Sequence, residues 1–179
     1  FSNSSTLTGS NPEKGSSNMW RFLYDCTKLT KINYPQNEKI KPSSLSYTFH
    51  NCQKMTSIDL GWIDYSILTS MEYAFSTCLK LTEIVGIEDV NTSKVTNMNG
   101  TFRSCSSLTS LDLSSWDTSQ CTNMGGMFAS CTLLTDVSFI NEWDLSKVAS
   151  FNALCHGAKA LTSFTLDSKD LSSLTDCNY

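Results

Sequence analysis

Hydrophobic and polar positions along the chain repeat with a period of 26 or 27 residues. The clearest copy places apolar residues at Met98, Phe102, Cys105, Leu108, Leu111 and Leu113. One cysteine marks the same place in five copies, at Cys26, Cys52, Cys78, Cys105 and Cys131. A fixed period of this length is typical of repeat proteins, in which each copy is one supersecondary unit. We expect a single repeat domain over 1–179, with six copies over 19–166, a remnant or capping copy over 1–18 and a partial copy over 167–179.

Within one copy the apolar spacing changes from a helical to a strand period. Met98, Phe102 and Cys105 step by 4 and 3 residues, which favours one face of a helix, whereas Leu111 and Leu113 step by 2. Each copy is therefore predicted to form a short helix followed by a strand. We interpret the Asx residue two positions before the serine that opens each helical stretch as a helix cap. These residues are Asp64, Asn91, Asp117 and Asp144.

One such unit cannot bury its apolar stripe alone, whereas stacked units share a continuous core. Parallel strands lie about 4.8 Å apart and packed helices about 8–10 Å apart, so we expect an α/β solenoid that bends. The prediction is a curved leucine-rich-repeat solenoid with a parallel β-sheet on its concave face and short helices on its convex face. Alternate strand residues then point outward from the concave face. The candidate ligand-binding residues there are Asp59, Glu83, Val85, Ser110, Asp112, Asp136 and Ser138.

The cysteines and the charges narrow the chemistry that the chain could perform. The five cysteines in register read as small core residues, and Cys121, Cys155 and Cys177 fall at other positions, with a redox state that the sequence leaves open. No Cys-x2-Cys pair suggests zinc, and no nucleophile elbow or phosphate loop is present. A net charge of −4 without a basic stripe argues against nucleic-acid binding. We predict no enzyme activity, no metal and no cofactor.

Residues 108–131 carry a phrase that resembles a known repeat family. The strand Leu-Thr-Ser-Leu-Asp-Leu, the turn Ser-Ser-Trp-Asp-Thr-Ser and the segment Thr-Asn-Met-x-x-Met-Phe-x-x-Cys closely resemble the repeat of BspA-like leucine-rich-repeat surface proteins. The resemblance covers residues 19 to 166 and implies secretion or surface display on a bacterium or a mucosal protist. It also implies adhesion to host matrix proteins, mucosal surfaces or other microbes, without catalytic residues.

These observations lead to two functional hypotheses. The first is a non-catalytic extracellular or cell-surface adhesion module that binds a protein or glycan ligand of a host or microbe through the concave face. We expect it to be a monomer that does not insert into a membrane, because no stretch approaches 18 apolar residues. The alternative is an intracellular protein–protein interaction scaffold of the same fold, in which free thiols would persist. Trp62, Trp116 and Trp143 either pack against the next copy or form a sugar-stacking platform, and we favour packing.

Overall fold

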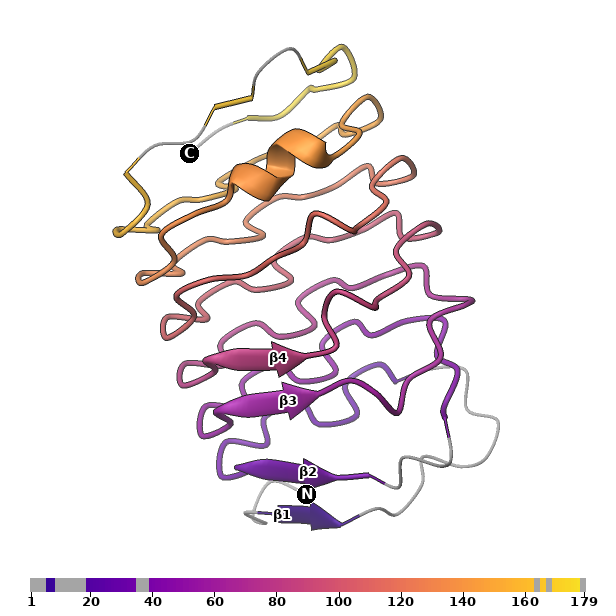
Figure 1. Cartoon of the computed structure of the whole chain (residues 1–179), viewed down its shortest axis with the longest axis vertical. Coiled ribbons are helices and arrows are strands. Elements are labelled where there is room, and N and C mark those ends of the chain that lie inside the picture. The colour runs from indigo at the N-terminus through magenta and orange to yellow at the C-terminus, as the bar shows by residue number, and fades with distance from the viewer. Residues whose placement is uncertain (1–5, 9–18, 35–38, 163–164, 167–168, 178–179) are drawn as a thin grey trace.

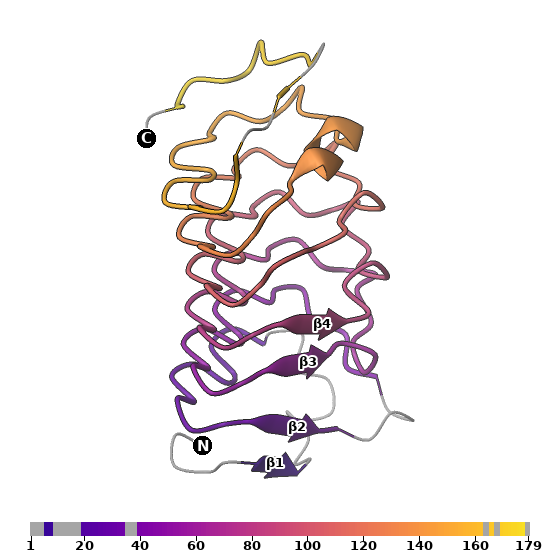
Figure 2. The ribbon, with the colours of Figure 1, turned by 60° about the vertical axis from the view of Figure 1, so that its left-hand side comes forward.

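The chain forms a stack of similar coils that follow one another in sequence order. The computed structural model describes residues 6–8, 19–34, 39–162, 165–166 and 169–177. In Figures 1 and 2 each coil lies over the preceding one, from the indigo N-terminal end to the yellow C-terminal end. The predicted solenoid of about 26-residue units is therefore the observed architecture. The domain limits at 1 and 179 stay a prediction.

One side of the stack carries short parallel strands at the predicted positions. They are β1 (Thr6–Thr8), β2 (Lys31–Asn33), β3 (Ser57–Asp59) and β4 (Glu83–Val85). β1 pairs with β2 and β3 pairs with β4, both in parallel register, with Ile58 opposite Ile84. The central residue of β3 and of β4 is buried and the two flanking residues are exposed. The period-2 pattern thus identified the inward and outward positions correctly.

The opposite side of each coil is a run of tight turns that hydrogen-bond to the next coil. The backbone N–H groups of Tyr47 and Phe49 donate to Glu72 and Ala74 of the following coil, at 2.9 and 2.8 Å. The intervening N–H of Thr48 instead donates to the carbonyl three residues earlier in its own coil, at 3.0 Å. Parallel bridges continue this ladder along the stack. They join Ser44 to Ser70, Ser70 to Asn97, Asn97 to Asn123, Asn123 to Ser150 and Ser150 to Asp176.

The predicted convex-face helices are wrong. Among the described residues the only helix is the 3₁₀ helix η1 (Ser138–Glu142), which lies on the strand side of its coil. Two residues in each run of turns have positive φ, such as Gly100 at 60° and Ser104 at 61°, and a right-handed helix cannot include that conformation. The three-residue turns place Met98, Phe102 and Cys105 on the inside at a spacing of 3 to 4 residues. This spacing is the one that sequence analysis reads as a helix.

The core is a column of side chains stacked from coil to coil. Phe49, Phe75, Phe102 and Phe128 are fully buried, with nearly parallel rings whose centroids lie 5.3, 5.5 and 5.9 Å apart along the series. The inward residues of the strands, including Ile58 and Ile84, belong to the same hydrophobic cluster. Each coil therefore buries its apolar side chains mainly against its two neighbours, as a solenoid requires.

The physical reason for expecting a bend is absent. The bend was predicted because helices need about 8–10 Å where strands need about 4.8 Å. The stacked phenylalanine rings lie 5.3 to 5.9 Å apart, and backbone hydrogen bonds join neighbouring coils on the turn side as well. Because no helix is described on the turn side, we describe the face that carries β3 and β4 as the strand face and not as a concave face.

The terminal segments are described in part. β1 lies within the segment expected to form a remnant or capping copy, and its Leu7 pairs with Ile32 of the first complete copy. Most of residues 1–18, including the segment between β1 and Met19, lie outside the described residues, as do 163–164, 167–168 and 178–179 at the other end. The bridge from Ser150 to Asp176 shows that the partial terminal copy continues the turn-side ladder.

Candidate functional site

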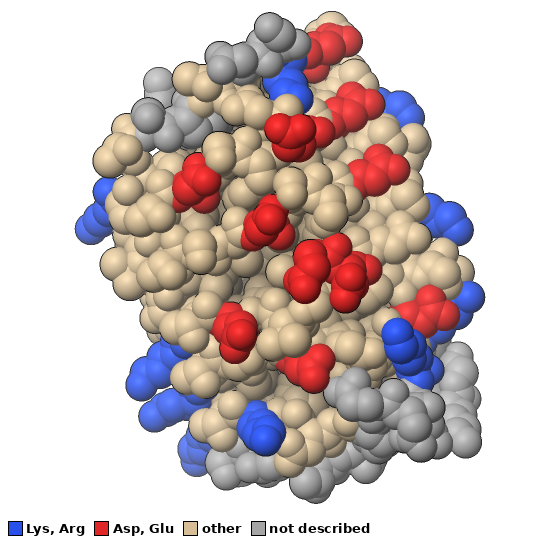
Figure 3. Space-filling model, in the orientation of Figure 1, with Lys and Arg blue, Asp and Glu red and all other residues tan. Residues whose placement is uncertain are grey.

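The strand face presents all seven candidate binding residues to solvent. Asp59, Glu83 and Val85 lie at the outward positions of β3 and β4, and Val85 is 45% exposed. Ser110 and Asp112 occupy the equivalent places on the next coil, without forming a regular strand. In Figure 3 acidic residues spread over this face, whereas lysine and arginine lie mostly along its edges. The strand face is therefore acidic and hydroxylated.

The outward residues do not form continuous columns along the stack. Ser57 lies opposite Glu83 in the β3–β4 register, and its hydroxyl lies 3.4 Å from the Glu83 carboxylate. Beyond β4 the regular pairing ends, because the described residues show no ladder between Glu83–Val85 and residues 110–112. Ser138, which was predicted to lie on a strand, begins η1. A longer segment after Val137 changes the backbone there, so this part of the predicted sheet is wrong.

Several of the acidic residues also stabilise turns. Asp112 accepts hydrogen bonds from the Ser114 hydroxyl at 2.7 Å and from the Ser114 N–H at 3.1 Å. These two donors lower the pKa of the Asp112 carboxyl. Asp136 accepts the Ser138 N–H and hydroxyl at 2.9 and 2.8 Å, which lowers its pKa in the same way. Both side chains therefore stay ionised at neutral pH and hold the local chain in an Asx turn.

The residues interpreted as helix caps form a second set of such turns. Each accepts the backbone N–H two residues later, so the local contact predicted for them is confirmed, although no helix follows. The N–H donors are Ser66, Ser93, Ser119 and Ser146, at 2.9, 3.1, 3.0 and 2.9 Å from Asp64, Asn91, Asp117 and Asp144 respectively. Asn91 shows that an amide oxygen can replace the carboxylate in this turn.

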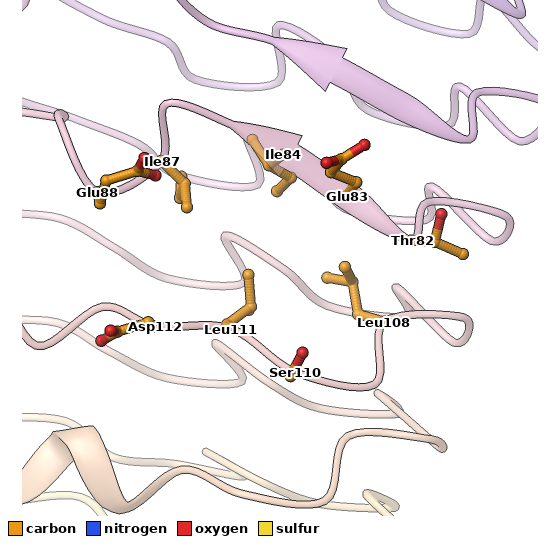
Figure 4. A pocket seen from close by; sticks show the side chains of 9 residues that line it. All are labelled: Thr82, Glu83, Ile84, Ile87, Glu88, Leu108, Ser110, Leu111 and Asp112. Carbon is orange, nitrogen blue, oxygen red and sulfur yellow. The ribbon is translucent and has the colours of Figure 1, made fainter.

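A groove opens on the strand face where the regular pairing ends. It has a volume of about 460 Å³ and lies between β4 and residues 108–112. Figure 4 shows that Leu108 and Leu111 point from the facing coil toward β4, with Ser110 and Asp112 beside them. Glu83 and Glu88 flank the groove on the β4 side. The structure thus brings Glu83, Ser110 and Asp112 of the predicted set together around one hollow.

The cysteine column (Cys26, Cys52, Cys78, Cys105 and Cys131) is part of the core, as predicted. Each of these side chains is 2% exposed or less. Four of the thiols donate to a backbone carbonyl of the preceding coil, as Cys105 does to Phe75 at 3.1 Å. Burial raises the pKa of Cys78 and of Cys131 to about 12. The column is therefore poorly suited to nucleophilic chemistry.

The predicted helices are absent from the described residues, so the spacing of packed helices does not keep the cysteines of this column apart. All eight cysteines are nevertheless free thiols; Cys155 is half-buried and Cys177 is exposed. Each carbonyl-bonded thiol in the column is directed toward the backbone of the neighbouring coil. This contact gives the column a structural role.

Neither histidine lies in a catalytic arrangement. His50 is half-buried and stacks on Tyr24 with ring centroids 4.9 Å apart, and burial lowers its pKa. Its sequence neighbour Cys52 faces the core and donates to the carbonyl of Leu23 at 3.3 Å. Among the described residues no group of three or more histidine, cysteine or acidic side chains is placed to hold a metal ion. No described helix has the length and apolar character needed to cross a membrane.

A second surface feature was missed by sequence analysis. On the turn side Arg21 lies 4.4 Å from the ring centroid of Tyr24 and 5.8 Å from that of Tyr47. Tyr47 stacks on Tyr73 with centroids 5.1 Å apart. Arg21, Tyr47 and Tyr73 are each 26 residues apart and all have positive φ. This shared register is the signal that could have revealed them. The sequence analysis compared only the apolar positions of the copies and therefore missed it.

The three tryptophans that follow the strands pack inward, as favoured. Trp62, Trp116 and Trp143 are at most 3% exposed, so they form no sugar-stacking platform. The indole N–H of Trp116 donates to the carbonyl of Ile87 at 3.0 Å, and that of Trp143 donates to Leu113 at 2.9 Å. These contacts tie one coil to the one before it.

Comparison with known proteins finds a family model that matches most of the chain. The family model described as "Mycoplasma protein of unknown function, DUF285" matches residues 43–168. No curated protein matches the chain in a sequence search.

Two solved structures of leucine-rich-repeat proteins are similar to the chain. The T. pallidum leucine-rich-repeat protein TpLRR is 19% identical with a TM-score of 0.44, and the match covers 69% of this chain and 60% of that one. A leucine-rich-repeat protein from Bacteroides ovatus is 22% identical with a TM-score of 0.41, over 72% of this chain and 38% of that one. The chain thus spans between 38% and 60% of the length of these two proteins.

Proposed function

We propose that this chain, which belongs to the DUF285 family, is a non-catalytic binding module that holds a protein or glycan ligand against its strand face. In the intact protein the module is displayed outside the cell or secreted, and it mediates adhesion to a host surface, a matrix protein or another microbe. The resemblance of residues 108–131 to the BspA-like surface repeat supports this placement.

The observation that carries the proposal is the composition of the strand face. Its outward side chains are exposed carboxylates and hydroxyls with one apolar residue, Val85, near the centre. Four other acids, Asp64, Asp117, Asp144 and Asp170, complete Asx turns within their own coils. An extended polar surface on a rigid scaffold suits recognition of a large ligand through many weak contacts.

The first test is binding of the purified chain to an array of matrix proteins and mucosal glycans. The decisive variant is the triple substitution Asp59→Asn, Asp112→Asn and Asp136→Asn. Because Asn91 forms the same turn with an amide oxygen, asparagine should preserve the fold while removing three charges from the strand face. We expect the melting temperature to stay within a few degrees and binding to the array ligand to fall by about tenfold or more.

A matched control removes three charges from the other set of Asx turns. It is the triple substitution Asp64→Asn, Asp117→Asn and Asp144→Asn, which alters the same kind of turn away from the seven candidate binding residues. We expect this control to retain most of the binding. If binding survives in the strand-face variant and is lost on altering Lys94 and Arg103, the opposite side of the stack is the binding surface and the proposal is wrong.

The intracellular scaffold is a second candidate, favoured by the free thiols. Unpaired cysteines persist more readily in a reducing compartment. Nevertheless, the cysteine column is buried and its high pKa values slow oxidation, so the thiols also suit a secreted protein. Fractionation of the native cells, with immunodetection on intact and permeabilised cells, separates the two candidates. Detection only after permeabilisation would support the scaffold.

A further inference from the structure

The groove between β4 and residues 108–112 lies at one of the places where strand pairing is interrupted; among the described strands, β2 and β3 are also not paired with each other. The β3–β4 pair is hydrogen-bonded in register, whereas no described backbone hydrogen bond joins β4 to residues 110–112. The coil of β4 carries Ile87 and Val90 between the strand and Asn91, where the neighbouring coils bury Trp62 and Trp116. The coil of β4 thus has two aliphatic side chains where its two neighbours have an indole.

The floor of the groove is apolar and firmly held. Ile84, Ile87 and Leu108 are 5%, 6% and 1% exposed, so they form a buried base, and half-buried Leu111 projects from the facing coil. Such a floor can pack the methylene groups of a long side chain. Its volume of about 460 Å³ falls within the range of about 300–1,000 Å³ that is usual for ligand pockets.

The sides of the groove carry negative charge without a compensating cation. Glu83 and Glu88 lie on the β4 side and Asp112 lies on the opposite side, and no lysine or arginine lines the groove. None of the three carboxylates forms an ion pair with a described residue. Both contacts from Ser114 go to one oxygen of Asp112, the Oδ1 atom, so its Oδ2 atom faces no described donor.

We propose that this groove is a subsite for a single lysine or arginine side chain of a protein ligand. The methylene stem lies along Ile84, Ile87 and Leu111, and the cationic head binds the carboxylates of Glu88 and Asp112, which lie at the same end of the groove. Glu83 lies at the other end, with its carboxylate 3.4 Å from the Ser57 hydroxyl of β3, and adds negative charge at a greater distance. A planar guanidinium offers several donors to carboxylates on two sides, so arginine is preferred over lysine. The inference deepens the proposed function, on which it rests, by naming the chemistry of the ligand. A neutral glycan would leave these carboxylates unpaired.

The test uses small probes and the isotopically labelled whole chain. We titrate Nα-acetyl-arginine methylamide, and separately the norleucine and citrulline analogues, and follow backbone amide shifts by NMR. The expected result is saturable shifts at residues 83–88 and 108–112, with both neutral analogues weaker by about tenfold or more. The variant Glu83→Gln, Glu88→Gln and Asp112→Asn should abolish these shifts. All three side chains are exposed, so this variant should fold.

The controls give each alternative its own outcome. Equal binding of arginine and norleucine would show a purely apolar groove and overturn the proposal. If the arginine probe also shifts the amides near Asp64, Asp117 and Asp144, and these shifts vanish in the Asn variant of those residues, the attraction is a nonspecific charge effect. That outcome would overturn the proposal as well. If a strand-face ligand is found on the array and the arginine probe leaves the groove unaffected, the subsite is wrong while the proposed function stands. If the probe binds and no array ligand depends on the strand face, the proposed function is wrong and the subsite stands.

Discussion

Gly100 and Gly126 provide a matched pair for testing how the turn side of the stack is built. Both lie at the same place in successive coils, and their φ angles are 60° and 59°. A Cβ atom at Gly100 would lie 2.4 Å from the Cε1 atom of the Tyr73 ring, whereas one at Gly126 would lie 3.4 Å from the end of the flexible Arg103 side chain. The two sites therefore share the same backbone strain and differ in the steric contact.

The expected difference follows from that contact. Alanine at positive φ costs about 1–2 kcal/mol, partly offset by about 0.4–1 kcal/mol from the lower entropy of the unfolded chain. Both terms apply equally to Gly100→Ala and Gly126→Ala. Overpacking against Tyr73 adds about 1–3 kcal/mol at Gly100 alone. We expect urea denaturation to show that Gly100→Ala lowers the free energy of unfolding by this additional amount.

The assay includes a background that removes the contact. In Tyr73→Ala the further substitution Gly100→Ala should cost no more than Gly126→Ala does in the original chain, because the ring is gone. Arg21, Tyr47 and Tyr73 occupy the equivalent place with φ between 50° and 59°, so the backbone itself accepts a side chain there. Equal costs for the two glycine substitutions, or an extra cost at Gly100 that persists without the tyrosine, would refute the stacking of Tyr73 over Gly100.

Three further outcomes are expected. Phe102→Ala should lower the free energy of unfolding by about 3–5 kcal/mol, because the buried ring stacks on two neighbouring rings. Ser110→Ala should change it by less than about 0.5 kcal/mol. Equal losses of stability for the two variants in urea denaturation would contradict the repeat register. In the folded chain a thiol reagent should label exposed Cys177 and leave the cysteine column unlabelled, which mass spectrometry can measure. Rapid labelling of the column would contradict its burial. Hydrogen bonds from Ser119 lower the pKa of the Asp117 carboxyl, so the stability that this carboxylate contributes is present above its unfolded pKa of 3.8 and is lost as the pH falls through the lower folded pKa. In thermal melts from pH 5 to pH 2, Asp117→Asn should therefore reduce the loss of stability with falling pH. An unchanged pH dependence would contradict this contribution.

The repeat and its core could be predicted from the sequence because burial alone determines both. The apolar residues at Met98, Phe102, Cys105 and Leu108 face inward in every plausible coil geometry, and all four are buried. Leu111 is the exception, since it is only half-buried beside the groove. Its environment depends on the length and side chains of the coil of β4, which a comparison of apolar positions within one copy does not include.

The helices could not be predicted correctly because two backbone geometries bury the same residues. An α-helix and a succession of three-residue turns both return a side chain to the inside after 3 or 4 positions. The distinction lies in residues at positive φ, such as Asn51, Gly100 and Gly126. Asparagine and glycine tolerate that conformation, but Tyr47 and Thr77 adopt it here as well, so the local sequence gives only a partial signal. The hydrogen bonds between coils compensate for this strain.

The high hydroxyl content has a structural role that composition alone could not reveal. Serine and threonine make up about a quarter of the chain, which by itself suggests only a polar surface. In the structure the hydroxyls of Thr69, Thr82 and Thr122 each donate to a carbonyl of the preceding coil, at 2.9, 3.0 and 3.1 Å. Many hydroxyls therefore form hydrogen bonds between neighbouring coils, so their protons are already donated within the protein.

These hydrogen bonds between coils reduce the number of surface groups that can bind a ligand. A hydroxyl that already donates to a neighbouring coil has less to offer a partner, and a carboxylate that closes an Asx turn has fewer open positions. Glu83 and Glu88 are different, because neither of them closes a turn and both flank the groove. The coil of β4 differs from its two neighbours in having no tryptophan after its strand, and it is unpaired on the side of residues 110–112. The subsite proposed above therefore predicts that recognition of a ligand centres on this coil.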